Sequence, residues 1–407
     1  MTSLTDLAVT IDDIRAAAGR IESSVVRTPC TKSSAFSQVA GAEVFFKHDH
    51  LQSTGSFKER GARNTLMLLT AEQKASGVIA ASAGNHALAL AHHGRELGIA
   101  VTVVMPKFAP LTKMVKCGGL GANVIQHGES FDDARAYALE LTRDLHLTYI
   151  HGFDNPHIIA GAGTVALEML QDVSQFDAIL IPVGGGGLLA GMAVAIRTIS
   201  PGTKIIGVET EHAPTLHASL GAKKIVRIDA RPTLADGLAI AEPGKLCFDI
   251  ATQLVDEVLL VDESHIARAV LQLLELERTL VEGAGAAACA AVLQFAARWK
   301  GQRIGVVLCG SNIDLSMLGR LIDRGLAADG RLCRMKCAIS DRPGGLARLT
   351  ALIAQTGASI REIDHDRNFA SPDVASVVVN IVLEIRDRNH AEELKTHLAA
   401  HAIRVVE

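Results

Sequence analysis

The sequence predicts an α/β protein with an open, doubly wound parallel sheet, followed by a smaller unit of ferredoxin-like type. From about residue 78, short β-branched runs such as "GVIAAS" (77–82) alternate with longer helical stretches such as "NHALALAHHGREL" (85–97). Apolar runs of about four to eight residues separated by helices are typical of buried parallel strands joined by crossover helices. After about residue 332 the order becomes strand, helix, strand, strand, helix, strand, which is the ferredoxin-like arrangement.

The predicted strands follow in order along the chain. In the first part they are the apolar runs at 77–82, 99–106, 122–127, 177–184, 203–209 and 303–310. In the second part strands are predicted at 334–340, 358–366, 375–385 and 402–406, with helices at 344–355 and 390–401. Ligands of doubly wound sheets bind at the carboxyl ends of strands. We therefore expect functional residues in the loops that follow strands.

The length of the chain and a change in its sequence pattern indicate more than one domain. A chain of 407 residues exceeds one ordinary core and predicts about two to three domains. The segment "RGLAADGR" (324–331) is polar and rich in small residues, and it separates the two patterns. We place the boundary there, with a first domain at 1–328 and a second at 332–407.

Composition argues against several classes of protein. With 48% hydrophobic and 21% charged residues, a net charge of -4 and no basic run with interleaved aromatic residues, the chain is not expected to bind nucleic acid. The N-terminal segment lacks the basic and apolar regions of a signal peptide, and the longest apolar stretch, 184–196, is too short to span a bilayer. A cytoplasmic location without a membrane partner is the expectation.

Cysteines and histidines give no metal pattern. The seven cysteines are scattered and odd in number, so reduced thiols are expected. Cys333 and Cys337 could suggest a zinc pair, but no second pair at suitable spacing accompanies them. His48 and His50 flank Asp49 with no third ligand evident, and we interpret them as loop or strand-end residues. No metal site is expected.

Three segments at strand-to-helix junctions carry candidate chemistry. Four consecutive glycines, 184–187, follow an apolar strand and precede a helix, where free backbone N–H groups and the helix dipole form a phosphate cradle. In "ASAGNHALA" (81–89), Ser82, Gly84 and Asn85 can hold a carboxylate or phenolic oxygen, and capping of the helix is the alternative.

The third segment, "STGSFKERG" (53–61), contains Lys58. A lysine amine attacks carbonyl groups when it is neutral, and a desolvated site lowers its pKa; a solvated surface charge is the alternative. Taken together, a nucleophilic lysine, a phosphate cradle and a polar strand end are what pyridoxal 5'-phosphate requires, because its ring is an electron sink for amino-acid carbanions.

Four motifs in this order resemble those of the fold-type-II pyridoxal-phosphate enzymes, in particular the L-threonine ammonia-lyases (threonine dehydratases) and their serine dehydratase and serine racemase relatives. They are "LQSTGSFKERGARN" (51–64), "SAGNHALALA" (82–91), "PVGGGGLLAG" (182–191) and "VLCGSNID" (307–314). The resemblance covers about residues 25 to 325. It implies two open twisted α/β subdomains within 1–328, the smaller one, roughly 50–155, being inserted in the larger.

The second domain has a resemblance of its own. The segment "DRPGGLARLTALIAQTGASI" (341–360) resembles an ACT domain, a small regulatory module that often binds amino acids. The resemblance implies allosteric regulation by an amino-acid effector at 332–407. It also implies a homodimer or homotetramer.

The resemblance implies roles for single residues. Lys58 would hold the cofactor covalently and, once released by substrate, remove the Cα proton, and Asn85 would bond the cofactor's 3′-oxygen. The residues that would bind the cofactor phosphate are Gly184, Gly185, Gly186, Gly187 and Leu188. Those that would surround the substrate carboxylate, mostly through backbone groups, are Ser82, Ala83, Gly84 and His86.

Cys309 falls where the family places a hydroxyl or thiol, usually serine, facing the pyridine nitrogen. A neutral partner there does not favour a protonated ring, which is adequate for an enzyme that quickly expels a β-hydroxyl group. Taken by itself, Cys309 also fits a buried thiol at a strand end.

The sequence departs from the family at several positions. Ala83 replaces the serine of relatives with racemase activity and cannot donate a proton, so poor racemisation is expected. In the cation-binding stretch of the racemase-like members, Glu209 is kept but Thr215 replaces the second acid, so a divalent-metal requirement is not expected. His48 replaces the usual glutamate near the cofactor loop.

The sequence therefore predicts a pyridoxal-phosphate lyase that removes water and then ammonia from L-threonine, with L-serine as a slower substrate, in isoleucine biosynthesis or threonine catabolism. A serine or 3-hydroxyaspartate dehydratase stays open, because the sequence does not show the pocket for the β-substituent. An alternative of another class is a catalytically silent amino-acid sensor that acts through its ACT-like domain.

Overall fold

The chain divides into two compact units, Met1–Met317 and Leu318–Glu407, in a computed structural model that describes residues 7–366 and 376–406. The division lies ahead of the expected boundary at 328–332, because α14 (Leu315–Ala328) belongs for most of its length to the second unit. Among the described residues, no helix is both long enough and apolar enough to cross a bilayer.

The first unit contains two sheets, as the fold class implies. The large sheet has the strand order β1-β2-β10-β7-β8-β9 and is parallel except for β1, which pairs antiparallel with β2. Its strands are β1 (Cys30–Ser33), β2 (Glu43–Lys47), β7 (Ala178–Pro182), β8 (Lys204–Thr210), β9 (Glu257–Val261) and β10 (Arg303–Val307).

The small sheet is wholly parallel and has the order β5-β4-β3-β6. Its strands are β3 (Val78–Ala81), β4 (Val101–Met105), β5 (Asn123–Gln126) and β6 (Thr148–Tyr149). All of them fall within the range 50–155 expected for an inserted subdomain. Burial of residues on both faces, as in "VTVVM" of β4, explains why β3 and β4 form the two central strands.

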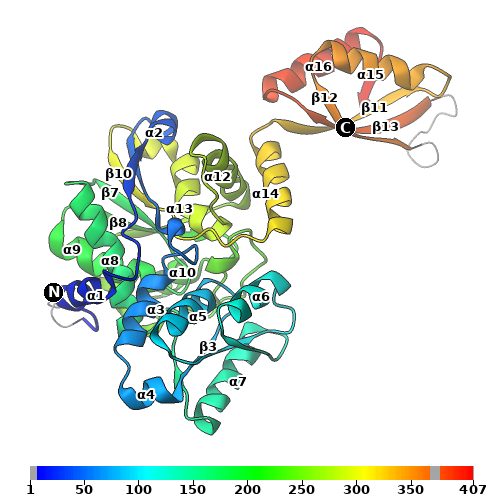
Figure 1. Cartoon of the computed structure of the whole chain (residues 1–407). Helices are drawn as coiled ribbons and strands as arrows, with labels where there is room; N and C mark the ends of the chain where they lie inside the picture. The colour runs from blue at the N-terminus through cyan, green and yellow to red at the C-terminus, as the bar shows by residue number, and fades with distance from the viewer. Residues whose placement is uncertain (1–6, 367–375, 407) are drawn as a thin grey trace. The chain divides into compact units, whose positions relative to one another are not determined.

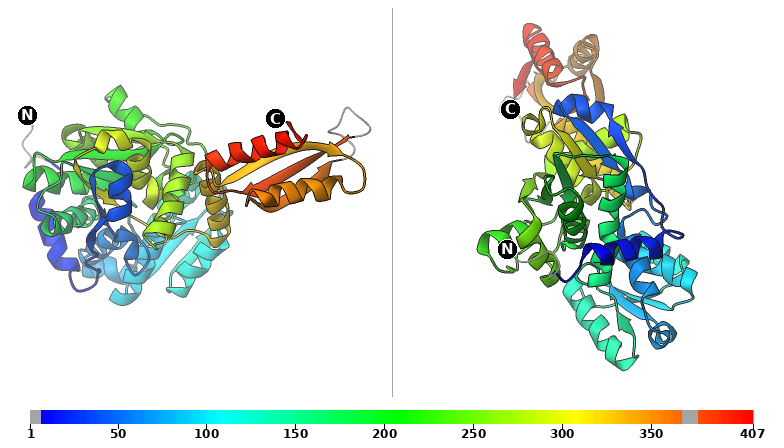
Figure 2. Two further views of the ribbon diagram at one scale, coloured as in Figure 1. Left: turned by 90° about the horizontal axis from the view of Figure 1, so that it is seen from above. Right: turned by 90° about the vertical axis from the view of Figure 1, so that its left-hand side faces the viewer.

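Helices cover both faces of the large sheet (Figures 1 and 2). The helices of this unit are α1 (Ile11–Ile21), α2 (Ser34–Ala40), α3 (Lys58–Met67), α4 (Ala71–Ser76), α5 (Asn85–Leu97), α6 (Leu111–Gly119), α7 (Phe131–Asp144), α8 (Pro156–Asp172), α9 (Gly187–Ile199), α10 (Thr215–Ala222), α11 (Lys245–Leu254), α12 (Glu263–Leu276) and α13 (Gly283–Gln294). One apolar core joins β7 to α8 and α9, and another joins β3 and β4 to α5.

The second unit has the predicted β-α-β-β-α-β order and the antiparallel strand order β12-β13-β11-β14. Its elements are β11 (Leu332–Ser340), α15 (Gly345–Gln355), β12 (Ser359–Asp366), β13 (Ser376–Glu384), α16 (Arg388–Ala400) and β14 (Arg404–Val406). A separate core lies between this sheet and its two helices. The ferredoxin-like arrangement is confirmed; residue 375 of the predicted strand lies outside the described residues.

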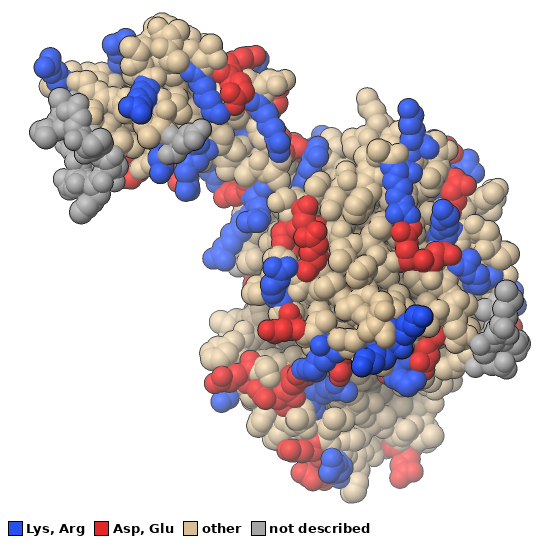
Figure 3. Space-filling model, turned by 180° about the vertical axis from the view of Figure 1, so that it is seen from behind, with Lys and Arg blue, Asp and Glu red and all other residues tan. Residues whose placement is uncertain are grey.

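Basic and acidic side chains are interspersed on the surface. On the face drawn in Figure 3, Lys and Arg alternate with Asp and Glu, and the described residues of that face show no continuous basic stripe. Although a net charge of -4 could coexist with a local basic patch, this side of the molecule shows no strongly basic patch among its described residues.

Candidate active site

The carboxyl ends of β3, β7 and β10 open into one cavity of about 1090 Å³. The loops that follow parallel strands all lie at the same edge of the sheet. Segments that are distant in the sequence therefore meet at this cavity. Every residue that the sequence predicted for the site lines this cavity: Lys58, Ser82, Ala83, Gly84, Asn85, His86, Gly184, Gly185, Gly186, Gly187, Leu188 and Cys309. Their individual roles remain predictions.

Lys58 begins α3 with its amine in the cavity. Its Nζ donates a hydrogen bond to the Gly152 carbonyl oxygen at 2.7 Å. Burial lowers the pKa of Lys58 to about 8, and the nearby Cys309 and Cys247 thiols oppose this shift. A desolvated amine is neutral and nucleophilic far more often than a surface lysine, so Lys58 is not an ordinary surface charge.

The start of α5 offers open backbone N–H groups. Gly84 occupies the N-cap position and no side chain caps the helix, so the capping interpretation of Ser82 and Asn85 is wrong. The Ser82 N–H donates to the Val104 carbonyl oxygen at 3.1 Å, and the Gly84 N–H donates to Ser82 Oγ at 3.3 Å. The N–H groups of the first turn of α5 have no side-chain cap and can therefore hold an anion.

His86 is held in a neutral state beside this turn. Burial lowers its pKa to about 3, and the Lys58 charge adds to the shift. Its Nε2 lies 3.1 Å from the Ile150 carbonyl oxygen, which makes Nε2 the protonated nitrogen. A neutral ring supplies no cation, so an anion at this turn would be held through backbone groups.

The glycine loop requires its glycines. Gly186 is the N-cap of α9 with φ +97° and no side-chain cap, and a Cβ there would lie 2.8 Å from Cys247 Cβ. A Cβ at Gly187 would lie 2.9 Å from the Phe153 carbonyl oxygen, and one at Gly185 would overlap the Phe153 ring. The loop therefore packs too closely against Phe153 and Cys247 to accept a Cβ, and the start of α9, which has no side-chain cap, can hold a phosphate through its N–H groups.

Asn85 lies in a polar network that the sequence analysis missed. Its Nδ2 donates to Glu282 Oε1 at 2.7 Å, and its Oδ1 accepts from Asn312 Nδ2 at 2.8 Å. One N–H of Asn85 remains for a ligand, because the amide nitrogen carries two. Burial raises the pKa of Glu282 to about 7, and the charge of Asp236 contributes. A lone acid in the apolar "VEGAGAA" at the start of α13 was the available signal.

Cys309 is a neutral thiol that lines the cavity. Its Sγ donates to the Ala284 carbonyl oxygen at 3.8 Å. Burial raises the pKa of this thiol, and the Glu282 charge adds to the shift. The residue thus has the uncharged character that the resemblance implies for the group facing a pyridine nitrogen.

Glu209 stabilises the start of a helix. Its two carboxylate oxygens accept the N–H groups of Leu216 at 2.7 Å and His217 at 2.9 Å, in the first turn of α10. Burial raises its pKa to about 7. Thr215 donates its hydroxyl to the Ile240 carbonyl oxygen. Both side chains of the suspected cation stretch are thus engaged in local structure.

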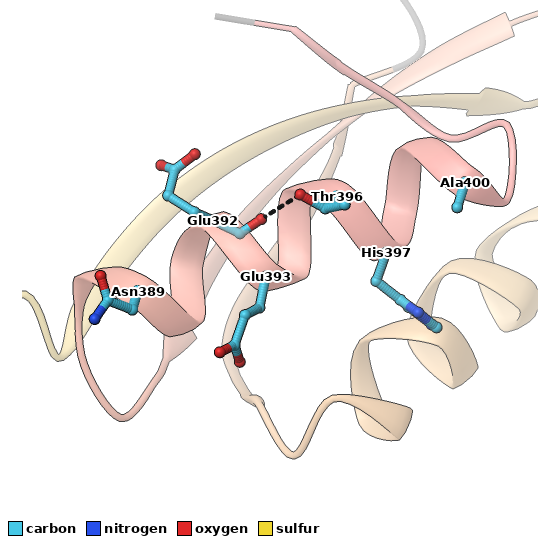
Figure 4. Close-up of a pocket in the computed structure, with 6 residues that line it drawn as sticks. All are labelled: Asn389, Glu392, Glu393, Thr396, His397 and Ala400. Carbon is cyan, nitrogen blue, oxygen red and sulfur yellow. Dashed lines mark hydrogen bonds between the residues drawn. The ribbon is translucent and has the colours of Figure 1, made fainter.

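A second hollow lies along α16 in the C-terminal unit (Figure 4). It is lined by Asn389, Glu392, Glu393, Thr396, His397 and Ala400. These residues come from one exposed helix, and Thr396 Oγ1 donates to the Glu392 carbonyl oxygen of the same helix at 2.9 Å. No group from another element converges on it among these lining residues, so the cavity around Lys58 is the candidate active site.

Comparison with known proteins is consistent with this geometry. Residues 21–310 match the family model described as pyridoxal-phosphate dependent enzyme. An L-threonine ammonia-lyase of Thermotoga maritima is 40% identical over 400 residues, which is 98% of this chain and 100% of that protein. The catabolic L-threonine dehydratase TdcB of Escherichia coli strain K12 is 39% identical over 78% of this chain and 97% of its own length.

A solved structure has the same fold. The processed form of threonine deaminase isoform 2 from Solanum lycopersicum superposes with a TM-score of 0.73 and 34% sequence identity. The match covers 78% of this chain and 90% of that chain.

Proposed function

The chain belongs to the pyridoxal-phosphate dependent enzyme family, and from this premise we propose that it converts L-threonine to 2-oxobutanoate and ammonia, with L-serine as a slower substrate. The relative from Thermotoga maritima, which matches almost the whole chain, supports this substrate. The observation that carries the proposal is the half-buried Lys58, with its lowered pKa, in one cavity with the glycine loop.

The cavity fits pyridoxal 5'-phosphate. The uncapped start of α9 offers backbone N–H groups that suit a phosphate, and close packing on Phe153 and Cys247 explains why the loop before it consists of glycines. Asn85 keeps one N–H for the ring's 3′-oxygen, and the neutral Cys309 thiol suits an unprotonated ring nitrogen. When bound, the cofactor supplies an electron sink for the negative charge that develops at the substrate Cα.

The protein's own groups then account for the elimination. The carboxylate of the substrate binds at the open first turn of α5, where backbone N–H groups and the helix dipole favour an anion. Lys58 Nζ would remove the Cα proton and, as the ammonium group so formed, pass it to the β-hydroxyl group, which leaves as water. The resulting enamine, once free, takes up water and loses ammonia to give the 2-oxo acid. Ala83 offers no proton donor on the opposite face, so little racemisation is expected.

Two cations that line the cavity are already paired with acidic side chains. Arg227 is paired with Asp132 and lies 3.8 Å from Glu242. Lys113 is paired with Asp236 at 3.1 Å. Arg135, which also lines the cavity, is the cation that the second carboxylate of 3-hydroxyaspartate would have to use, so the substrate assay decides between this substrate and threonine.

For the second unit we propose an ACT-like regulatory role. Its β-α-β-β-α-β order supports this assignment, and it implies an amino-acid effector and a homodimer or homotetramer. Titration of the enzyme with isoleucine and valine, with activity and sedimentation as readouts, tests both parts. The silent-sensor alternative is disfavoured because lysine, asparagine and glycine cradle lie together in one cavity.

The deciding experiment is an absorbance spectrum of the purified protein, followed by a 2-oxo-acid assay on threonine, serine and 3-hydroxyaspartate. We expect the visible absorbance of a lysine-bound cofactor and the highest rate with threonine. Faster turnover of serine or 3-hydroxyaspartate would identify a different dehydratase. A colourless protein that stays inert after addition of the cofactor would support the sensor.

A further inference from the structure

Helices α3 and α5 pack side by side in the small-sheet region (Figure 1), and three ligand-type side chains meet between them. Glu59 comes from α3, and His92 and His93 come from α5. Each offers one nitrogen or oxygen atom, and these atoms all lie within 4.8 Å of one another. We propose that they form a binding site for a transition-metal ion, with Zn²⁺ as the ion that fits this set of ligands.

Two of the three side chains are buried and lack hydrogen bonds at the atoms that face the site. The side chains of Glu59 and His93 are both 0% exposed. Glu59 Oε1 accepts the Thr54 N–H, but Glu59 Oε2 and His93 Nε2 have no hydrogen-bond partner. Burying a carboxylate oxygen without a partner is unfavourable, and a bound cation would satisfy both atoms.

The spacing of these atoms fits an intervening ion better than a direct contact. Glu59 Oε2 and His93 Nε2 are 3.5 Å apart. A direct charge-assisted hydrogen bond would be about 2.7–2.9 Å long. Two neighbouring ligands of tetrahedral zinc, each about 2.0–2.2 Å from the ion, are about 3.3–3.5 Å apart.

The other nitrogen of His93 is already arranged as metal ligation requires. His93 Nδ1 lies 3.2 Å from Glu96 Oε2, so that the carboxylate accepts its proton. This leaves the lone pair of Nε2 directed at the site, as in the carboxylate–histidine–zinc arrangement. Arg63 donates to the same Glu96 oxygen at 3.1 Å and holds this carboxylate in place.

His92 completes the protein ligands on the solvent side. Its side chain is 17% exposed, and its Nε2 lies 3.6 Å from Glu96 Oε1. An ion can therefore enter past His92, and water can take a fourth position. Two imidazoles and a carboxylate suit Zn²⁺ and its neighbours, whereas Mg²⁺ prefers a shell of oxygen atoms.

The site would connect the two helices that position the active site. Glu59 directly follows Lys58 at the start of α3, and Asn85 begins α5. None of Glu59, His92 and His93 lines the cavity around Lys58. The ion would therefore have a structural role, fixing α3 against α5, and would take no part in the reaction itself.

Binding is tested on untagged holoenzyme depleted of metal by dialysis against a chelator. Titration with Co²⁺, whose visible bands report tetrahedral nitrogen and oxygen ligands, should saturate at one ion per chain. Zn²⁺ should displace Co²⁺ and Mg²⁺ should not. In thermal unfolding, Zn²⁺ should raise the Tm of the depleted protein.

Variants locate the ion. His92→Gln is partly exposed and is expected to fold, and it should weaken Co²⁺ binding by more than the roughly 10–100-fold expected for Glu96→Gln, which changes only the support of a ligand. The matched control is His265→Gln on α12, where His265 Nδ1 also pairs with a carboxylate, Asp262, at 2.8 Å. It should bind Co²⁺ as the wild type does and keep the Zn²⁺-dependent rise in Tm.

Two results would overturn the proposal. One is the absence of stoichiometric Co²⁺ and Zn²⁺ uptake by the depleted wild type. The other is equal uptake by His92→Gln, once its cofactor absorbance shows that it has folded, since the ion would then bind elsewhere.

Discussion

At the scale of single residues, removal from water decides how the side chains of the site behave. Burial lowers the pKa of Lys58 to about 8 and that of His86 to about 3, while it raises the pKa of Glu282 to about 7. Amine and imidazole are thus shifted toward their neutral forms and the carboxyl group toward its protonated form. A cavity of this kind favours nucleophilic attack by an amine over simple charge pairing.

Replacement of Lys58 tests the central assignment. Lys58→Ala removes both the covalent anchor of the cofactor and the base for the Cα proton. The visible absorbance of the lysine-bound cofactor should disappear, and turnover of threonine should fall by at least about 10²–10⁴-fold. Lys116→Ala, at an exposed position of α6, is the control and should behave as the wild type. A Lys58→Ala protein with normal spectrum and rate would refute the assignment.

His50 gives a prediction about acid stability. Burial lowers its pKa from 6.5 to about 4, and His48 adds to the shift. Between these two pH values the unfolded chain binds a proton that the folded chain does not. Stability is therefore lost as pH falls from 6.5 to 4, by about 1.4 kcal/mol per pH unit for this one group.

His50→Gln should remove that one proton from the uptake on unfolding. The lowered pKa values of His86 and His151 also reduce the stability of the fold as pH falls. The pKa values of Glu209 and Glu282, raised to about 7, have the opposite effect, because the fold loses stability as pH rises toward 7. The difference between variant and wild type isolates His50. Urea unfolding at a series of pH values measures it, and parallel curves would show that His50 is not the group involved.

At the scale of elements, the loop between β7 and α9 determines whether a phosphate can be held. Gly186→Ala would place a side chain in the left-handed region, at a cost of about 1–2 kcal/mol, and its Cβ 2.8 Å from Cys247 Cβ. Retention of the cofactor during dialysis against cofactor-free buffer should fall about tenfold. Gly221→Ala, which meets no atom within 4 Å, is the control. Equal retention by both variants would contradict the cradle.

A buried ionic cluster fixes α3 to α8. Arg60 bonds Asp49 at 2.7 and 2.8 Å and Glu168 at 2.7 and 2.8 Å, with Thr164 at 3.1 Å. Burial by itself would raise the pKa of Asp49, but the Arg60 guanidinium outweighs burial and lowers it. These carboxylates therefore depend on the guanidinium for compensation.

Arg60→Met should destabilise the first unit by about 3–5 kcal/mol, because Asp49 would lose its buried guanidinium partner, while Glu168 would keep its ion pair with Lys47. Urea unfolding measures the change. Arg15→Met, which breaks the exposed pair with Asp12, is the control and should have little effect. If both variants unfold at the same urea concentration, the buried cluster is not what holds α3 in place.

At the scale of the whole molecule, the two units have separate cores. The apolar cluster of the second unit runs from Met335 to Ile403 and includes no residue of the first unit. The Escherichia coli dehydratase matches 78% of this chain with 97% of its own length. We therefore expect the first unit to fold without the ferredoxin-like unit.

The chain 1–328 should fold, bind the cofactor and turn over threonine within a few fold of the full chain, while losing any response to amino-acid effectors. Absorbance and 2-oxo-acid release measure these properties, with the full chain as reference. An insoluble or colourless 1–328 would show that the second unit is needed for folding. The domain boundary itself stays a prediction, because the contacts divide the chain at 317.

Local sequence determined the parallel strands, the ferredoxin-like order and the segments that line the cavity. Hydrophobic periodicity and turn residues act over short distances, so "VTVVM" and the glycine run could be read directly. The family resemblance supplied the roles expected of Lys58 and Asn85.

Only the tertiary structure decided which distant groups meet and which lose contact with water. In the folded chain, Asn85 donates a hydrogen bond to Glu282, which lies 197 positions away in the sequence. Glu209 accepts N–H groups at the start of α10, and Glu59 of α3 lies near His92 and His93 of α5. Sequence spacing does not reveal such contacts, because they depend on packing between separate helices and sheets. Desolvation likewise arises only in the folded chain, and it lowers the pKa of the Lys58 amine to about 8.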